Sequence, residues 1–117
     1  MTEQSRLGRI EVSPQAIAGL AATAVLECYG VVGMARPTPY SGFAEVLQRE
    51  HHRRGVRVNV NNERITIDLY VVFEYGVRIS EVAQNIMENV KFRVEKALGI
   101  PIDAVNVHVQ GLRLSGN

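Results

Sequence analysis

Residues 56–73 read VRVNVNNERITIDLYVVF, and this stretch decides the fold class. Its first five residues alternate valine with a polar residue, which is typical of a strand with one buried and one exposed face. The alternation resumes from Ile65 to Phe73, where apolar residues again take every second position. Asn61 and Asn62 lie between the two runs, and asparagine tolerates the left-handed backbone that tight hairpin turns require. The stretch therefore predicts a β-hairpin with one hydrated face.

Two amphipathic helices are predicted, one on each side of this hairpin. Ser13 and Pro14 fit the N-cap and first residue of a helix whose apolar residues recur at helical spacing as far as Cys28. The second helix is expected to have Ser80 as its N-cap and to stop at Gly99, a length of about 20 residues. Its acidic residues come early and its basic residues late, which suits the helix dipole.

Three further strand signals complete the predicted order. Residues 9–12 and 31–34 form short apolar or alternating runs, and residues 105–109 alternate valine with polar residues. The alternation changes phase at Gly111, which indicates a bulge or the end of the strand. The order is β-α-β-β-β-α-β. Elements with a single apolar face pack most simply in two layers, so we predict an α+β fold in which both helices cover one face of a small, mostly antiparallel sheet.

Length and composition fit a single globular domain. The chain has 117 residues, of which 46% are hydrophobic and 21% charged, and these values exclude wholesale disorder. The net charge of +1 excludes a strongly basic binder of polyanions, and the single cysteine excludes a disulfide framework. No apolar run approaches the length of a membrane span. We expect one domain over 1–117, with a core over about 8–112 and an exposed excursion over 36–55 in which 43–47 can form a turn of helix.

The polar positions of the strands are expected to share the sheet face that points away from the helices. Tyrosine and arginine on an open face are typical anchors of protein–protein contacts, and the edge strand of so small a sheet invites pairing with another chain. The alternative interpretation is an ordinary hydrated face, on which Thr66 and Asn106 also lie. The candidate partner-binding residues are Arg57, Asn59, Asp68, Tyr70, His108 and Gln110.

Catalysis is the third interpretation of this face, because Asp68 and His108 are a candidate acid–base pair. No serine or cysteine nucleophile accompanies them on any predicted strand. We therefore predict no catalytic residues and no cofactor.

The segment Arg49–Arg57 is strongly basic, with four arginines against one glutamate. Such a cluster can bind the phosphates of a nucleic acid or of anionic lipids, or it can simply be a solvated loop. No aromatic residue interleaves the arginines, so base stacking is not indicated. His51 and His52 are adjacent and have no third ligand near them in sequence, so we predict no metal site. The candidate anion-binding residues are Arg49, His52, Arg53 and Arg54.

Several short blocks of the sequence together resemble a known family. They are VFEYGV at 72–77, ENVK at 88–91 and VNVHVQG at 105–111, while GRIEVS at 8–13 and GVVGM at 30–34 fit the same pattern. Over roughly residues 8–112 the chain resembles the alkaline-shock and envelope-stress proteins of mainly Gram-positive bacteria. The resemblance implies a small α+β domain without catalytic activity. It also implies a cytoplasmic location, with some members held at the membrane by a small integral-membrane partner.

The sequence thus favours a non-enzymatic stress-response adaptor that binds a protein partner, for which a small membrane protein is one candidate. We also expect the chain to form a homo-oligomer. The alternative is a nucleic-acid-binding module that uses the basic segment Arg49–Arg57.

Overall fold

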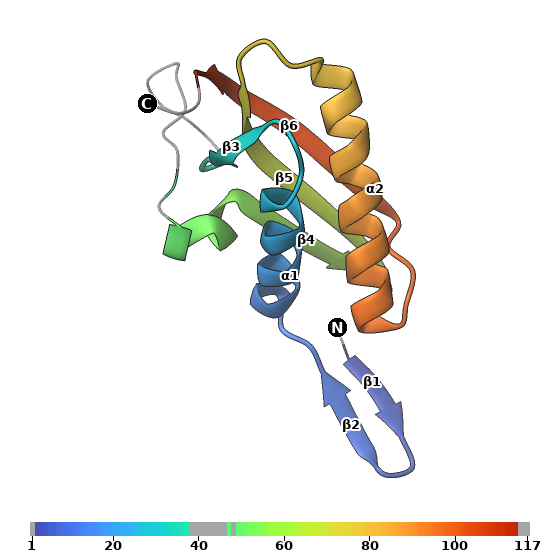
Figure 1. Cartoon of the computed structure of the whole chain (residues 1–117). Coiled ribbons are helices and arrows are strands. Elements are labelled where there is room, and N and C mark those ends of the chain that lie inside the picture. Colours follow the sequence, from blue (N-terminus) through green and yellow to red (C-terminus); the bar gives the residue numbers. More distant parts are fainter. Residues whose placement is uncertain (1, 38–46, 48, 115–117) are drawn as a thin grey trace.

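The computed structural model describes residues 2–37, 47 and 49–114 (Figure 1). The predicted α+β architecture is confirmed, with both helices packed against one face of the main sheet. The predicted turn of helix over 43–47 lies, apart from Leu47, outside the described residues. The elements in chain order are β1 (Thr2–Ser5), β2 (Gly8–Glu11), α1 (Pro14–Leu26), β3 (Val31–Met34), the 3-10 helix η1 (Arg49–Gly55), β4 (Val56–Asn61), β5 (Arg64–Glu74), α2 (Ile79–Leu98) and β6 (Ala104–Arg113).

Strand β5 is the centre of the main sheet. It pairs antiparallel with β4 through residues 64–69 and with β3 through residues 71–73. Strand β6 pairs with β5 through residues 66–74 and runs parallel to it. Because β6 takes one edge of β5, β3 and β4 share the other edge, end to end. The parallel pairing is a consequence of α2, which carries the chain back along the sheet between β5 and β6.

The phase change at Gly111 is a β-bulge and not the end of the strand, which was the other outcome that the sequence left open. Val109 pairs with Val71, but the next pair joins Gly111 to Val72. Gln110 is therefore the extra residue on β6. Beyond it, Leu112 pairs with Phe73 and the parallel ladder continues.

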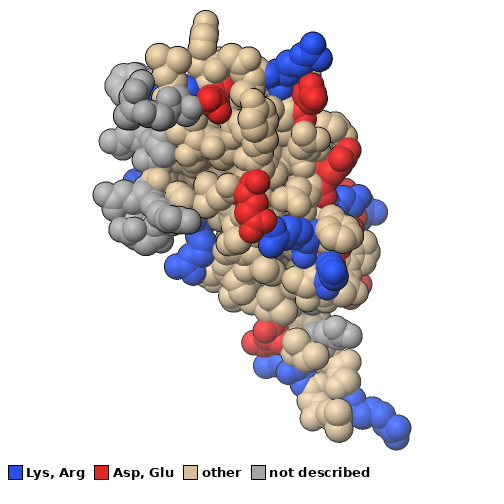
Figure 2. All heavy atoms as spheres, in the orientation of Figure 1, with Lys and Arg blue, Asp and Glu red and all other residues tan. Residues whose placement is uncertain are grey.

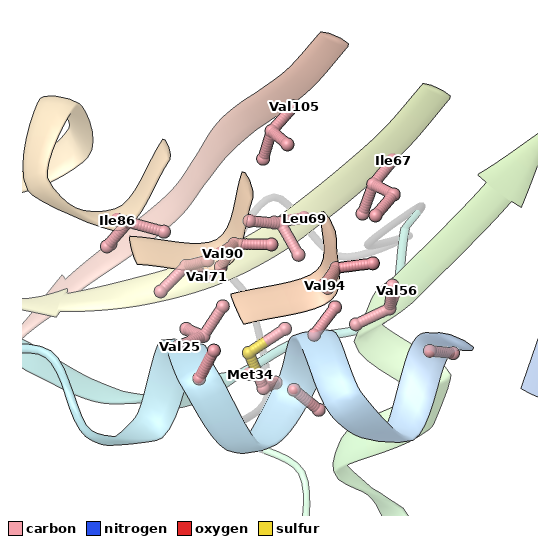
Figure 3. Packing of buried hydrophobic residues seen from close by; sticks show 14 of the residues in the cluster. Val25, Met34, Val56, Ile67, Leu69, Val71, Ile86, Val90, Val94 and Val105 are labelled. Carbon is pink, nitrogen blue, oxygen red and sulfur yellow. The ribbon is translucent and has the colours of Figure 1, made fainter. Parts of the chain in front are cut away.

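The hydrophobic core lies between the sheet and the two helices (Figure 3). Alternate residues of β5 from Ile65 to Phe73 point into it and are buried. Helix α2 contributes one buried residue per turn, and α1 contributes a broader stripe rich in alanine. Cys28 is half-buried at the rim of the core, where its thiol lies 3.4 Å from the Ala24 carbonyl oxygen. It therefore packs as a small apolar residue, although it lies beyond the end of α1 at Leu26.

The helix ends agree with the sequence at two of four positions. The helical pattern was expected to run to Cys28, but α1 ends at Leu26 and Glu27 is its C-cap. Ser13 caps α1, its hydroxyl oxygen accepting a hydrogen bond from the Ala16 N–H at 3.1 Å, and Gly99 ends α2 with φ of 75°. The prediction of Ser80 as N-cap is wrong. Arg78 takes that position, and its carbonyl accepts the first helical bond from the Val82 N–H at 3.0 Å. Ser80 consequently lies within the first turn of α2.

The hairpin turn between β4 and β5 is formed by Asn62 and Glu63, one position later than predicted. Asn61 pairs with Arg64 and so still belongs to β4. Asn62 and Glu63 have φ of 49° and 65°, as the common two-residue hairpin turn requires. Asparagine tolerates this conformation, whereas a glutamate there carries the full steric cost of its Cβ.

Replacing Glu63 with glycine is expected to raise the free energy of unfolding by about 0.5–1 kcal/mol, because glycine adopts positive φ without that steric cost. Urea denaturation followed by circular dichroism measures the change. Glu63→Ala is the matched control, since it removes the charge and keeps the Cβ, and it should bring no gain. A Glu63→Gly variant no more stable than Glu63→Ala would contradict this account of the turn.

The N-terminal segment differs most from the prediction. The strand expected at residues 9–12 is not part of the main sheet. Strand β2 instead pairs with β1 in a separate two-stranded hairpin that projects from the body (Figure 1). Strand β1 has no apolar residue, so hydrophobic periodicity gave no signal for it. The hairpin contributes to the elongated shape of the chain, whose principal extents are 54, 27 and 22 Å.

Candidate functional site

The six candidate partner-binding residues come from three adjacent strands. The pairing register sets Arg57 of β4 opposite Asp68 of β5, and Tyr70 of β5 opposite His108 of β6. Five of the six are on β5 or pair with positions of β5 that alternate with its buried residues, so they lie on the sheet face that points away from the helices, whereas Gln110 has no partner on β5. We call this surface the polar face, and it consists of Arg57, Asn59, Asp68, Tyr70, Asn106 and His108.

Asp68 is the centre of the hydrogen bonds on the polar face. Its Oδ1 accepts from His108 Nε2 at 3.0 Å and from Asn106 Nδ2 at 3.1 Å. Its Oδ2 accepts from Asn59 Nδ2 at 3.5 Å. These partners stand on β4 and β6, on either side of Asp68. One carboxylate therefore links the side chains of three strands, and its own side chain is only 19% exposed.

Tyr70 and His108 form an aromatic stack beside this carboxylate. The ring centroids are 4.6 Å apart and the ring planes differ by 10°. Because Asp68 accepts from Nε2, the imidazole is held at one nitrogen while its face lies against the tyrosine ring. The His108 side chain remains 43% exposed. The stack thus presents a fixed aromatic surface to solvent.

The other two candidates lie around this centre. Arg57 is exposed on β4, and Gln110 is the extra residue of the β6 bulge. A bulge changes the direction of the side chains next to it and often accompanies a functional surface. The sequence placed Asn106 on this face without assigning it a role, and the structure makes it a hydrogen-bond donor to Asp68. That role depends on the parallel register of β6, which the sequence prediction did not include.

The basic segment does not lie on the polar face. Its residues 49–55 form η1, which contacts α1 on the helical side of the sheet. A Cβ placed on Gly19 of α1 would lie 3.5 Å from Arg53 Cδ. Gly55 is buried, and a Cβ there would lie 2.8 Å from the Ala35 carbonyl oxygen. The last part of the predicted exposed excursion is therefore a packed helix.

The candidate anion-binding residues are thus carried by η1, separate from the polar face. His52 is half-buried, and Arg53 and Arg54 are exposed. His52 and Arg53 line a shallow hollow against α1 together with Glu27, whose carboxylate forms an ion pair with Arg93 of α2. Arg49 begins η1. Among the described residues, no group of histidine, cysteine, aspartate or glutamate side chains is arranged to hold a metal ion.

Comparison with known proteins identifies the family. The model of the alkaline shock protein 23 family, described as having a cell envelope-related function, matches residues 2–114. The chain belongs to this family. The resemblance found in the sequence is therefore confirmed, and the family description names no reaction.

Curated relatives from two bacterial genera agree with this assignment. The uncharacterized protein YloU of Bacillus subtilis is 41% identical over 113 residues, which cover 96% of this chain and 94% of the relative. The uncharacterized protein Spy1614 of Streptococcus pyogenes is 42% identical over 110 residues, covering 93% and 91% of the two chains. No solved structure gives a significant match. Within the described residues, no helix has the length and apolar character needed to cross a membrane.

Proposed function

We propose that this member of the family is a non-enzymatic interaction domain that works at the cell envelope by binding a protein partner on the polar face. The observation that carries the proposal is the arrangement of Asp68, His108 and Tyr70. A tyrosine and a histidine are stacked, one of them is held by a carboxylate, and an exposed arginine lies on the neighbouring strand. Tyrosine and arginine are the residues most often found as energetic anchors of protein interfaces.

The rigidity of this arrangement supports binding. A side chain that is free in solution loses conformational entropy when a partner immobilises it, which weakens the complex. Asp68 and His108 already have their hydrogen-bond partners, and Tyr70 is already stacked. Their rotamers are therefore fixed before any partner arrives, and little of that entropy remains to be lost.

The same contacts argue against a hydrolytic function. A histidine that acts as a general base needs a nucleophile within hydrogen-bond reach. Asp68 and His108 contact asparagine amides and a tyrosine ring, and none of these is a serine or cysteine nucleophile. The arrangement suits recognition better than bond cleavage.

The partner we propose is a small membrane protein that holds the domain at the cytoplasmic face. The family description, which relates these proteins to the envelope, supports this choice. Binding of nucleic acid by η1 is the competing function. It is less favoured because His52 is half-buried and both His52 and Arg53 lie against α1.

Affinity capture of the protein from its host, with and without nuclease, separates the two functions. We expect a protein partner to be retained from the membrane fraction after nuclease treatment, and equally by a variant with Arg53→Ala and Arg54→Ala. Recovery of nucleic acid that is lost on nuclease treatment, falls steeply with salt and disappears in the double variant would contradict the proposal.

A further inference from the structure

The N-terminal hairpin offers an unpaired strand edge. Residues 4–11 are all exposed, and the hairpin extends away from the body (Figure 1). A two-stranded hairpin is marginally stable in water by itself, and an open edge is a template for pairing with another strand. Within the described chain, both β1 and β2 pair only with each other. The outer edge of each is therefore open.

The pairing register shows which backbone groups β2 presents at its open edge. Ser5 pairs with Gly8 across a two-residue loop, and Ile10 pairs with Glu3 two positions further on. Antiparallel strands alternate between pairs that exchange backbone hydrogen bonds and pairs that do not, and the pair that closes a tight hairpin exchanges them. The N–H and C=O groups of Ile10 therefore point toward β1. Those of Arg9 and Glu11 point outward.

The open edge of β2 is complementary to itself in charge. If two copies of β2 pair antiparallel about a two-fold axis at Ile10, Arg9 of each copy lies opposite Glu11 of the other. Opposite charges directly across an antiparallel pair are stabilising. Arg9 and Glu11 already share one face of the strand, where Arg9 Nη2 lies 3.0 Å from Glu11 Oε1. Figure 2 shows acidic and basic side chains together on this hairpin.

The outward-pointing backbone groups and the charge pairs therefore both favour a two-fold axis at Ile10. The groups of Arg9 and Glu11 that point outward are the ones that would hydrogen-bond across the pairing, with Ile10 at the non-bonded position between them. The sequence of β1, TEQS, contains no cationic residue, so its edge offers no such pair of opposite charges. The edge of β2 is therefore the favoured one.

We propose that the partner of the hairpin is a second copy of this chain, and that β2 pairs with β2 to form a four-stranded sheet in the order β1-β2-β2-β1. Strand β2 runs from the tip of the hairpin toward the body, so antiparallel pairing places the two bodies at opposite ends of this sheet. In this arrangement the two bodies point away from each other. The dimer therefore displays two copies of the proposed partner-binding surface.

Charge exchange between two variants tests this pairing on the full chain. Arg9→Glu alone places two glutamates opposite two glutamates, and Glu11→Arg alone places arginine opposite arginine. In sedimentation equilibrium each variant is expected to self-associate at least about ten-fold more weakly than the natural chain. An equimolar mixture restores opposite charges at both positions, so it should dimerise like the natural chain.

Three other results would each contradict the pairing of β2 with β2. A natural chain that stays monomeric over the concentration series excludes it. Variants that dimerise as well as the natural chain show a different interface, and so does a mixture that stays monomeric after both single variants have lost the dimer. Because the substituted side chains are exposed on the projecting hairpin, the folded body serves as an internal control by circular dichroism.

A disulfide test locates the axis directly. In a Cys28→Ala background, Ile10→Cys places the two thiols across the non-bonded pair, where strands approach most closely. We expect a covalent dimer on mild oxidation. Leu7→Cys at the tip is the matched control, because its two copies would be about 20 Å apart along the paired strands. Equal cross-linking at both positions, or none at position 10, would contradict the axis.

Discussion

Replacing Phe73 with alanine is expected to lower the free energy of unfolding by about 3–5 kcal/mol. Phe73 is fully buried and is the largest of the completely buried side chains. It lies on β5 between Val31 of β3 and Leu112 of β6, where three strands meet over the helices. Truncation removes the buried ring and leaves a cavity that the surrounding strands can fill only in part, because their backbones are fixed by the sheet.

Phe92 provides a matched control for this prediction. It is 63% exposed on α2, where the Lys96 ammonium lies 5.8 Å from the centre of its ring. Phe92→Ala is expected to cost no more than about 1 kcal/mol, the value of an exposed cation–π contact. Urea denaturation of both variants measures the difference. Similar losses for the two phenylalanines would contradict the core described here.

Strands and helices with strict periodicity were predictable from the sequence. The alternation over 56–60 and 65–73 gave β4 and β5, and the apolar stripe ending at Gly99 gave α2. Strand β1 was not predictable in this way. It is exposed and polar, so its pairing depends on backbone hydrogen bonds, which leave no hydrophobic pattern. The charge pattern of α2 fits a start at Ser80, but that pattern does not fix the first residue, and the backbone carbonyl of Arg78 begins the helix.

The sequence predicted which residues share the polar face, but it did not predict the contacts among them. Alternation alone put Asp68, Tyr70 and His108 on one side of the sheet. Their contacts depend on the parallel register of β6, in which Tyr70 meets His108 and Asp68 meets Asn106. A strand followed by a 20-residue helix and another strand is itself a signal of parallel pairing, because the helix returns the chain to its starting edge. The register within that pairing is a tertiary property and leaves no local pattern.

Removal of the Tyr70 ring is expected to have the largest effect on function. The ring stacks on His108, which in turn is bonded to Asp68, so Tyr70→Ala removes one anchor and the stacking contact that supports the other. Truncation of an anchor residue at the centre of an interface typically costs at least about 2 kcal/mol, which corresponds to about 30-fold in affinity. Tyr70 is only half-buried on the polar face and not in the core, so the domain should stay folded.

Tyr75 is the matched control, because it follows β5 directly, is 66% exposed and lies outside the polar face. Quantitative capture of the proposed membrane-linked partner by the natural chain, Tyr70→Ala and Tyr75→Ala is therefore the most direct measurement of the proposed function. We expect Tyr75→Ala to retain the partner as the natural chain does, and Tyr70→Ala to lose at least about 30-fold in affinity while its circular dichroism spectrum is unchanged. A folded Tyr70→Ala variant that retains the partner in full would contradict binding at the polar face.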